Sequence, residues 1–244
     1  MPLPTELIVV ALAFAVAGVV QGALGFGFGL VSLSISAFVL AVSDAVPTVS
    51  LLGVFVYAGM LHLLRSDLVL RDALGMGVGL LAGVPVGVAL LRFGEPTWLL
   101  AGLGAVLLVG TAMQVFGGPP KAAGGERWGL AAGLLGGVLG GSLGSGGPPV
   151  VLYVSSRPWT PARGTACLQL IFLGMTATQL VGYGVSGLLG AQEATLALAG
   201  APAAVGGLWL GRTAFHRVPE LWFRRTVQAS LACLGLWFLS RGLL

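Results

Sequence analysis

Two glycine-rich stretches contain the residues of this sequence whose type and spacing could do chemistry. The first is GALGFGFG at residues 22–29, and the second is GGSLGSGGPP at residues 140–149. Both lie inside long uncharged runs, and glycine and proline break a helix. Each stretch therefore predicts a break followed by a new short helix. The N–H groups at the start of such a helix carry a partial positive charge of about half an elementary charge, which favours an anion.

The candidate binding residues surround the two breaks. Glycine lets a ligand approach the backbone closely, and the nearby amides and hydroxyls are neutral donors for the oxygens of a sulfonate- or carboxylate-type group. Two threonines and a glutamine at equivalent helix starts could line the same cavity. The predicted substrate-binding set is Gln21, Gly25, Gly27, Phe28, Gly29, Ser32, Thr48, Ser142, Gly144, Ser145, Gly146, Gly147, Arg163, Thr165 and Gln169.

Two features have competing interpretations. Glycines four apart in an apolar helix typically mark close helix packing, which we favour for Gly18, Gly22, Gly137 and Gly141. Arg163 either gates or attracts an anion from the cytoplasmic side, or it anchors a helix start at the membrane surface. The sequence favours neither interpretation of Arg163.

The composition places the breaks in a membrane protein. Of the 244 residues, 57% are hydrophobic and 8% are charged, whereas soluble domains have about a quarter of their residues charged. The apolar runs are continuous and reach the length of about 20 residues that a spanning helix needs, which excludes a β-barrel. The net charge of +4 comes from arginines in short loops, so we expect a lipid bilayer and no nucleic acid as partner. The two cysteines indicate no disulfide framework, and we expect no metal and no cofactor.

The chain is predicted to be duplicated. The glycines of the first stretch and of the helix before it, spaced G-x3-G-x2-G-x-G, recur with the same spacing in the second half. Thr48 and Thr165 then follow at matching places. This shared order predicts a first transmembrane repeat at 1–116, a cytoplasmic linker at 117–127 and a second transmembrane repeat at 128–244.

Each repeat is predicted to contain one helix, a short segment after the break, and three further helices. We expect these at 5–23, 28–42, 45–64, 73–91 and 97–116, and at 128–144, 147–156, 163–188, 194–211 and 222–243. Basic loop residues, which tend to stay cytoplasmic, occur at the third connection of the first repeat and at the fourth of the second. The predicted fold is therefore an all-α polytopic membrane protein with two inverted-topology repeats, broken or re-entrant first helices and about eight to ten membrane segments.

The residues around the breaks match a known family. GALGFGFGLVSLSI and GGSLGSGGPPVVLY, the latter followed by PARGTACLQLIFL, resemble the two repeats of the TauE/SafE sulfite exporter family of bacterial permeases. The resemblance implies transport, usually export, of sulfite, sulfonates and related anions. It assigns the family's motif glycines to Gly22, Gly25, Gly27, Gly141, Gly144, Gly146 and Gly147. The first repeat lacks the family's proline, and Pro148 replaces a motif glycine, so the resemblance implies the transport class rather than one substrate.

We therefore expect a secondary transporter, an exporter by resemblance, in the bacterial cytoplasmic (inner) membrane. It would move sulfite, a sulfonate or a related small sulfur-containing anion by alternating access, with the anion held between the half-helix N-termini of the two repeats. Every acidic residue lies at or outside the edge of an expected span, so a carboxylate relay has no candidate. Proton or ion coupling and a homodimer stay open.

Three alternatives to this function stay open. An anion channel or a permease subunit is the alternative within transport. A less favoured alternative is a membrane-bound enzyme that uses Cys167 as a nucleophile on a sulfur substrate. A purely structural membrane subunit would not need the paired breaks. We expect that this protein is not an enzyme.

Overall fold

The structure is a computed structural model that describes residues 2–116, 126–214 and 220–243. The first half contains α1 (Pro4–Leu24), α2 (Phe28–Ser36), α3 (Val42–Leu63), the 3₁₀ helix η1 (Arg65–Asp67), α4 (Leu70–Phe93) and α5 (Pro96–Phe116). The second half contains α6 (Glu126–Leu143), α7 (Gly147–Ser155), α8 (Pro161–Val185), α9 (Ala191–Ala214) and α10 (Glu220–Leu243). The described residues contain no strand, so the predicted all-α fold is confirmed.

The long helices begin and end close to their predicted positions, whereas the segment predicted at 28–42 is shorter. It forms α2, which ends at Ser36 because the N–H groups of Phe38 and Val39 turn back to the carbonyl oxygens of Ile35 and Ser36. α2 and α7 have 9 residues each. At a rise of about 1.5 Å per residue they cover about half of the hydrocarbon core. Neither short helix can cross a bilayer alone.

The outer surface of the bundle is apolar, as lipid contact requires. Six described helices are long and apolar enough to cross a membrane: α1, α3, α4, α5, α8 and α9. On α4, the side chains of Leu70, Leu74, Val78 and Leu81 recur every three to four residues and are each more than half exposed. A helix in water presents polar residues on such a face. The prediction of a polytopic membrane protein is therefore confirmed.

The first helix of each half packs closely against the fourth helix of the other half. These pairs are α1 with α9, and α6 with α4. A Cβ atom added to Gly18 would lie 2.5 Å from a carbonyl oxygen of α9, and one added to Gly141 would lie 2.5 Å from a carbonyl oxygen of α4. Gly22 and Gly137 meet the same two backbones. The prediction that these four glycines serve helix packing is confirmed.

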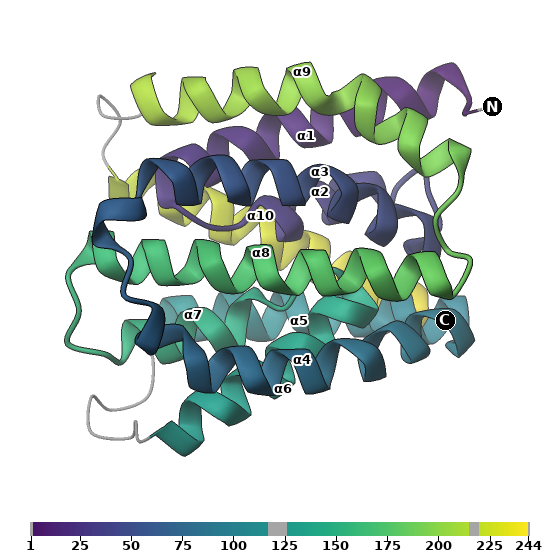
Figure 1. Cartoon of the computed structure of the whole chain (residues 1–244). Helices are drawn as coiled ribbons and strands as arrows, with labels where there is room; N and C mark the ends of the chain where they lie inside the picture. The colour runs from purple at the N-terminus through teal and green to yellow at the C-terminus, as the bar shows by residue number, and fades with distance from the viewer. Residues whose placement is uncertain (1, 117–125, 215–219, 244) are drawn as a thin grey trace.

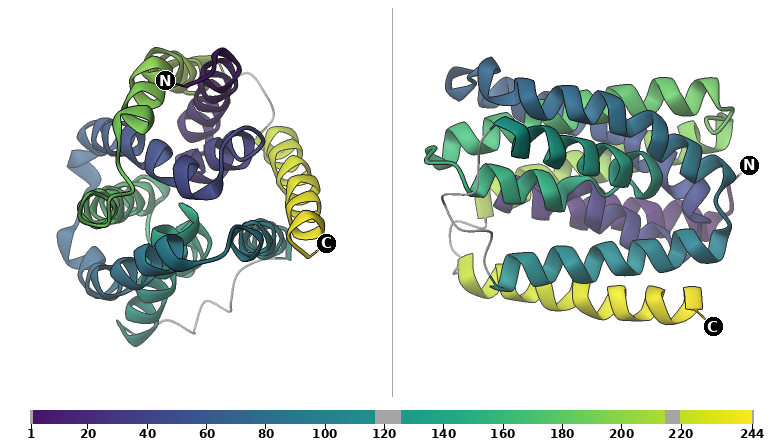
Figure 2. Two further views of the ribbon diagram at one scale, coloured as in Figure 1. Left: turned by 90° about the vertical axis from the view of Figure 1, so that its right-hand side faces the viewer. Right: turned by 90° about the horizontal axis from the view of Figure 1, so that it is seen from below.

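The two halves run in opposite directions along the bundle. In Figure 1, α1 and α3 run from right to left, α6 and α8 run from left to right, and both chain ends lie at the right. The last helices of the halves, α5 and α10, pack side by side at one edge of the bundle when it is viewed along its length (Figure 2). The division into two inverted repeats stays a prediction, and residues 117–125 of the predicted linker lie outside the described part.

Candidate substrate site between the two helix breaks

The first break, between α1 and α2, is made by two glycines in the left-handed region. Gly25 has a φ of 78°, and its N–H donates to the carbonyl oxygen of Gln21 at 2.9 Å, which ends α1. Gly27 has a φ of 106° and directly precedes α2. Residues with a side chain rarely adopt such angles. The shape of this break therefore depends on glycine at both positions.

The second break, between α6 and α7, offers fewer backbone donors than the first. Gly144 has a φ of 58° and follows the end of α6, and α7 begins at Gly147. The next two residues, Pro148 and Pro149, have no N–H. The first turn of α7 thus presents only the N–H of Gly147, whereas every position in the first turn of α2 has one. The two half-helix N-termini are not equivalent as anion sites.

The two breaks lie against each other and form a small cavity. A Cβ atom added to Gly29 would lie 2.7 Å from the carbonyl oxygen of Gly144, so this approach requires glycine. The cavity has a volume of about 20 Å³, which is room for about one water molecule. It is lined by uncharged residues: Phe26, Gly27, Gly29, Leu30, Tyr57, Gly144, Ser145, Gly146, Gly147, Phe172 and Met175. The structure therefore brings Gly27, Gly29, Gly144, Ser145, Gly146 and Gly147 of the predicted set together.

A buried hydrogen-bond network joins the first break to α8. Gln21 and Gln169 are fully buried, and Nε2 of Gln21 donates to Oε1 of Gln169 at 3.1 Å. Nε2 of Gln169 donates to the carbonyl oxygen of Gly25 at 2.6 Å, and Oε1 of Gln21 accepts the N–H of Phe28 at 3.1 Å. A Cβ atom on Gly25 would lie 2.8 Å from Cγ2 of Thr165. The network satisfies backbone groups that the break leaves without helical partners.

Of the five predicted residues with a hydroxyl group, three donate within their own helix, and Ser145 does not. Ser32, Thr48 and Ser142 each donate to the carbonyl oxygen one turn earlier, as serine and threonine often do in helices. Ser145 is 2% exposed, and its Oγ has no hydrogen-bond partner. Leaving a buried hydroxyl unpaired costs free energy. Because Ser145 lines the cavity, its unpaired hydroxyl is a candidate donor to a ligand there.

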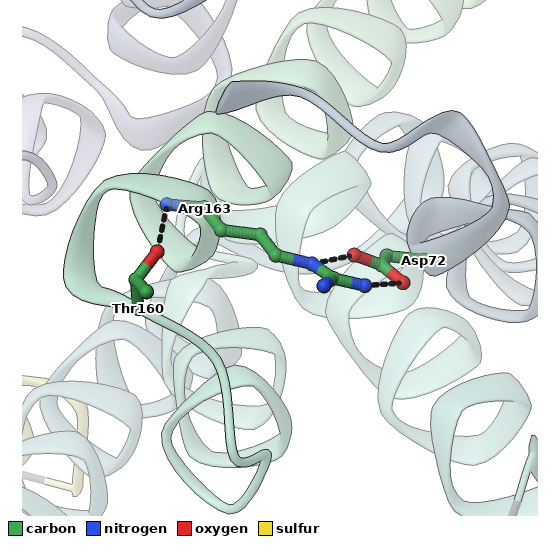
Figure 3. Close-up of polar contacts among 3 residues, drawn as sticks. All are labelled: Asp72, Thr160 and Arg163. Atoms are coloured by element: carbon green, nitrogen blue, oxygen red, sulfur yellow. Dashed lines mark hydrogen bonds and ion pairs between the residues drawn. The ribbon is translucent and has the colours of Figure 1, made fainter. Parts of the chain in front are cut away.

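Arg163 lies outside the cavity lining, at the start of α8, and forms an ion pair with Asp72 at the start of α4. Its Nε donates to Oδ2 of Asp72 at 2.6 Å and its Nη2 to Oδ1 at 2.8 Å, which is a bidentate arrangement (Figure 3). The backbone N–H of Arg163 donates to the hydroxyl of Thr160, the residue before α8. The side chain of Asp72 is 12% exposed and that of Arg163 is 38% exposed. A role for Arg163 toward substrate stays a prediction.

Sequence reasoning missed Asp72 and five residues that line the cavity. These five are Phe26, Leu30, Tyr57, Phe172 and Met175. The rings of Tyr57 and Phe172 pack against each other across the α3–α8 contact, with centroids 5.4 Å apart and ring planes tilted by 43°. Four of the five lie in apolar helices, where such side chains resemble their neighbours and no local signal marks them, whereas Phe26 lies inside the first break itself. No sequence pattern marks Asp72 either, because carboxylates are common next to predicted loops.

Comparison with known proteins identifies the family. The model of the sulfite exporter TauE/SafE family matches residues 10–238, which is nearly the whole chain. The chain belongs to the sulfite exporter TauE/SafE family. No curated protein and no solved structure matches it. The match spans both breaks and every predicted binding residue, and the resemblance found in the sequence is confirmed. TauE/SafE proteins are transporters, and Cys167, the candidate nucleophile, is buried and does not line the cavity of this TauE/SafE chain.

Proposed function

We propose that this chain is a secondary transporter that exports sulfite, a sulfonate or a related sulfur oxyanion across the bacterial cytoplasmic membrane. Membership of the TauE/SafE family supports the transport class. The observation that carries the site is the cavity shared by the two breaks, which is lined by Ser145, a residue whose buried hydroxyl has no hydrogen-bond partner. Two breaks at membrane depth that meet at one cavity are typical of transporter binding sites.

The donors around the cavity suit an anion that must be released again. The first turn of α2 contributes N–H groups, with that of Phe28 already held by Gln21, and the N–H of Gly147 and the hydroxyl of Ser145 add two more. No charged side chain lines the cavity. An oxyanion would be bound by neutral donors and by the helix N-terminus of α2. Such binding is moderate in strength, so the anion can be released on the other side of the membrane.

Loading the site requires the two breaks to separate. A sulfite ion is larger than the single water molecule that a cavity of about 20 Å³ admits. Two side-chain hydrogen bonds between buried residues join the halves, from Gln21 to Gln169 and from Ser50 to Gln179, each at 3.1 Å, and Gln169 also donates to the carbonyl oxygen of Gly25 at 2.6 Å. Movement of α8 relative to α1 and α3 would break these bonds and widen the cavity. We infer alternating access by such a movement.

Flux in proteoliposomes tests this function. Purified protein would be reconstituted, and sulfite movement would be followed against empty liposomes, with sulfoacetate, thiosulfate, sulfate and choline as competitors. We expect saturable sulfite flux that sulfur oxyanions reduce and choline leaves unchanged. Flux no greater than in empty liposomes would overturn the proposal, and flux that rises linearly without saturation would favour a channel.

A further inference from the structure

The cavity between the two breaks has walls without charge. All eleven described residues that line it are uncharged, and they come from α2, α3, α7, α8 and the two breaks. The only charged residue of α8 is Arg163, which lies nine residues before Phe172 of the cavity wall, or about 14 Å along the helix axis. Both carboxylate oxygens of Asp72 accept hydrogen bonds from Arg163, so its charge is matched outside the cavity. An ion in the cavity therefore meets no full positive charge in the wall.

Such a site discriminates between ions by their charge. The cost of moving an ion from water into a low-dielectric interior grows with the square of its charge, so a dianion costs about four times as much as a monoanion of equal size. The attraction of a helix N-terminus with about half an elementary charge grows only in proportion to the charge of the ion. Because the wall has no cationic side chain, the second negative charge of a dianion adds more cost than attraction. The site therefore favours a monoanion.

The first break contributes neutral donors to the cavity. The helical hydrogen bonds of α2 begin with the N–H of Val31, which donates to the carbonyl oxygen of Gly27 at 3.0 Å. The N–H groups of Gly29 and Leu30 precede this bond, and both residues line the cavity. Ser145 lines it as well, is 2% exposed, and has an Oγ without a hydrogen-bond partner. These donors suit the oxygens of an SO₃ group.

The second break contributes an acceptor to the same cavity. In a continuous helix, the carbonyl oxygens of Gly144 and Ser145 would accept from the residues four positions later, but these are Pro148 and Pro149, which have no N–H. None of the backbone hydrogen bonds at the described turns and caps goes to the carbonyl oxygen of Gly144. A Cβ atom on Gly29 would lie 2.7 Å from this oxygen, so the oxygen lies next to the start of α2. An acceptor there favours an anion that has a proton to donate.

We propose that the site takes the protonated monoanion, hydrogensulfite, in preference to the sulfite dianion, and thereby moves one proton together with the sulfur. This inference rests on the proposed function, because it specifies the charge of the same substrate. Sulfite and a proton combine to form hydrogensulfite on one side of the membrane, and the ion releases that proton on the other side, with no transfer of electrons. The protein then needs no carboxylate to carry the proton. Every Asp and Glu of the described α-helices lies in the first turn of its helix.

The titratable side chains near the cavity must be separated from the titration of the substrate. The wall contains one ionisable residue, Tyr57, and a phenol ionises well above neutral pH. His62, the histidine of the described part of the chain, is exposed near the end of α3, five residues after Tyr57. α1 and α6, which lead into the breaks, have charged residues only in their first turns. The other ionisable residues of α2, α3, α7 and α8 do not line the cavity: Asp44, Tyr153, Arg163, Cys167 and Tyr183.

Isothermal titration of the purified protein with three anions tests this inference. The titrations would be run at about pH 6 and about pH 8, a range in which histidine is the unperturbed side chain that changes charge. Sulfite exchanges its proton within this range, whereas methanesulfonate stays a monoanion and sulfate stays a dianion. We expect the affinity for total sulfite to be about tenfold lower at the higher pH, because only the hydrogensulfite fraction binds.

The other two anions calibrate this result. The affinity for methanesulfonate should be the same at both pH values, which shows that the protein itself does not titrate. Sulfate should bind at least about tenfold more weakly than sulfite does at the lower pH, so it competes with sulfite only at a correspondingly higher concentration.

The number of protons taken up gives a second measurement. Titration at the higher pH in buffers of different ionisation enthalpy should show about one proton taken up for each sulfite bound and none for methanesulfonate. The His62→Gln variant should show the same uptake as wild type. Loss of the uptake in this variant would assign the proton to the protein and overturn the inference.

Three further results would overturn the inference and leave the proposed function in place. They are equal sulfite affinity at both pH values, sulfate binding as tight as that of sulfite, and sulfite binding without proton uptake. Failure to bind any of the three anions, together with absence of sulfite flux, would instead reject the proposed function.

Discussion

Nε2 of Gln21 donates a hydrogen bond to Oε1 of Gln169 at 3.1 Å, although the two residues lie 148 positions apart in the chain. The bond joins the last turn of α1 to the middle of α8, and both side chains are fully buried. It is therefore a contact between the two halves at the first break. Gln21 and Gln169 must separate or form hydrogen bonds with other groups if that break is to open.

Loss of this network should destabilise the protein. Gln169→Leu removes the donor to the carbonyl oxygen of Gly25 and the acceptor of Gln21, so these two buried groups keep only their longer bond to each other, at 3.3 Å. We expect the free energy of unfolding to fall by about 1–3 kcal/mol, measured by denaturation in detergent. Gln192→Leu, at the start of α9 and outside the network, is the control. Equal stability of the two variants would contradict the structural role of Gln169.

Removal of the Ser145 hydroxyl should weaken sulfite binding without lowering the stability of the fold. Because Oγ of Ser145 is buried without a partner, Ser145→Ala should leave the free energy of unfolding unchanged or raise it by up to about 1 kcal/mol. The same variant should bind sulfite more weakly. Ser142→Ala is the matched control, since Oγ of Ser142 donates to its own helix at 2.7 Å. Binding by isothermal titration and melting in detergent measure both effects. A Ser145→Ala variant with wild-type sulfite affinity would exclude this hydroxyl from the site.

The Arg163–Asp72 ion pair should control access to the interior from its end of the bundle. Cys167 lies one turn after Arg163 on α8 and is 1% exposed, which makes it a native reporter. In a Cys233→Ser background, we expect Asp72→Asn to make Cys167 react several-fold faster with a membrane-impermeant thiol reagent, because α8 is then free to move away from α4.

Asp72→Glu is the control for this experiment, since it keeps the negative charge and should stay close to the wild-type rate. An unchanged rate in Asp72→Asn would show that the ion pair does not hold α8 against α4.

Two glycines of α4 should respond oppositely to the same substitution. A Cβ atom on Gly79 would lie 2.8 Å from the backbone nitrogen of Leu134 in α6, whereas one on Gly77 would meet nothing within 4 Å. Gly79→Ala should therefore lower the free energy of unfolding by about 1–3 kcal/mol. Gly77→Ala should raise it by up to about 1 kcal/mol through helix propensity. Thermal melts followed by circular dichroism compare them, and a stable Gly79→Ala would refute close packing of α4 on α6.

The sequence predicted the breaks because their cause is local. Glycine and proline change backbone preferences at their own positions, so GALGFGFG and GGSLGSGGPP mark the ends of α1 and α6 without knowledge of the fold. The end of α2 was harder to predict, since the apolar run continues past Ser36 and only the hydrogen bonds of the following turn stop the helix.

The partners across the bundle could not be predicted from the sequence. Arg163 and Asp72 are 91 positions apart, and neither has a local pattern that selects the other. Tyr57 and Phe172 reach the cavity because α3 packs on α8, but in the sequence they are aromatic residues in apolar helices. The two prolines of α7, which lack an N–H, can be read from the sequence. Their effect on the number of donors at the second break depends on where the helix starts, and α7 begins at Gly147.

Sulfite flux in a cavity-filling variant tests the central claim most directly. A Cβ atom on Gly147 would lie 3.9 Å from its nearest neighbours, Leu30 and Phe172, both in the cavity wall, so Gly147→Ala should fold, and its methyl group should occupy the space of the one water molecule that the cavity admits. Gly174→Ala, where a Cβ meets nothing within 4 Å, is the matched control. We predict that wild type and Gly174→Ala carry saturable sulfite flux and that Gly147→Ala, with a melting temperature no lower than that of wild type, loses most of it. Wild-type flux in a folded Gly147→Ala variant would contradict a substrate site between the two breaks.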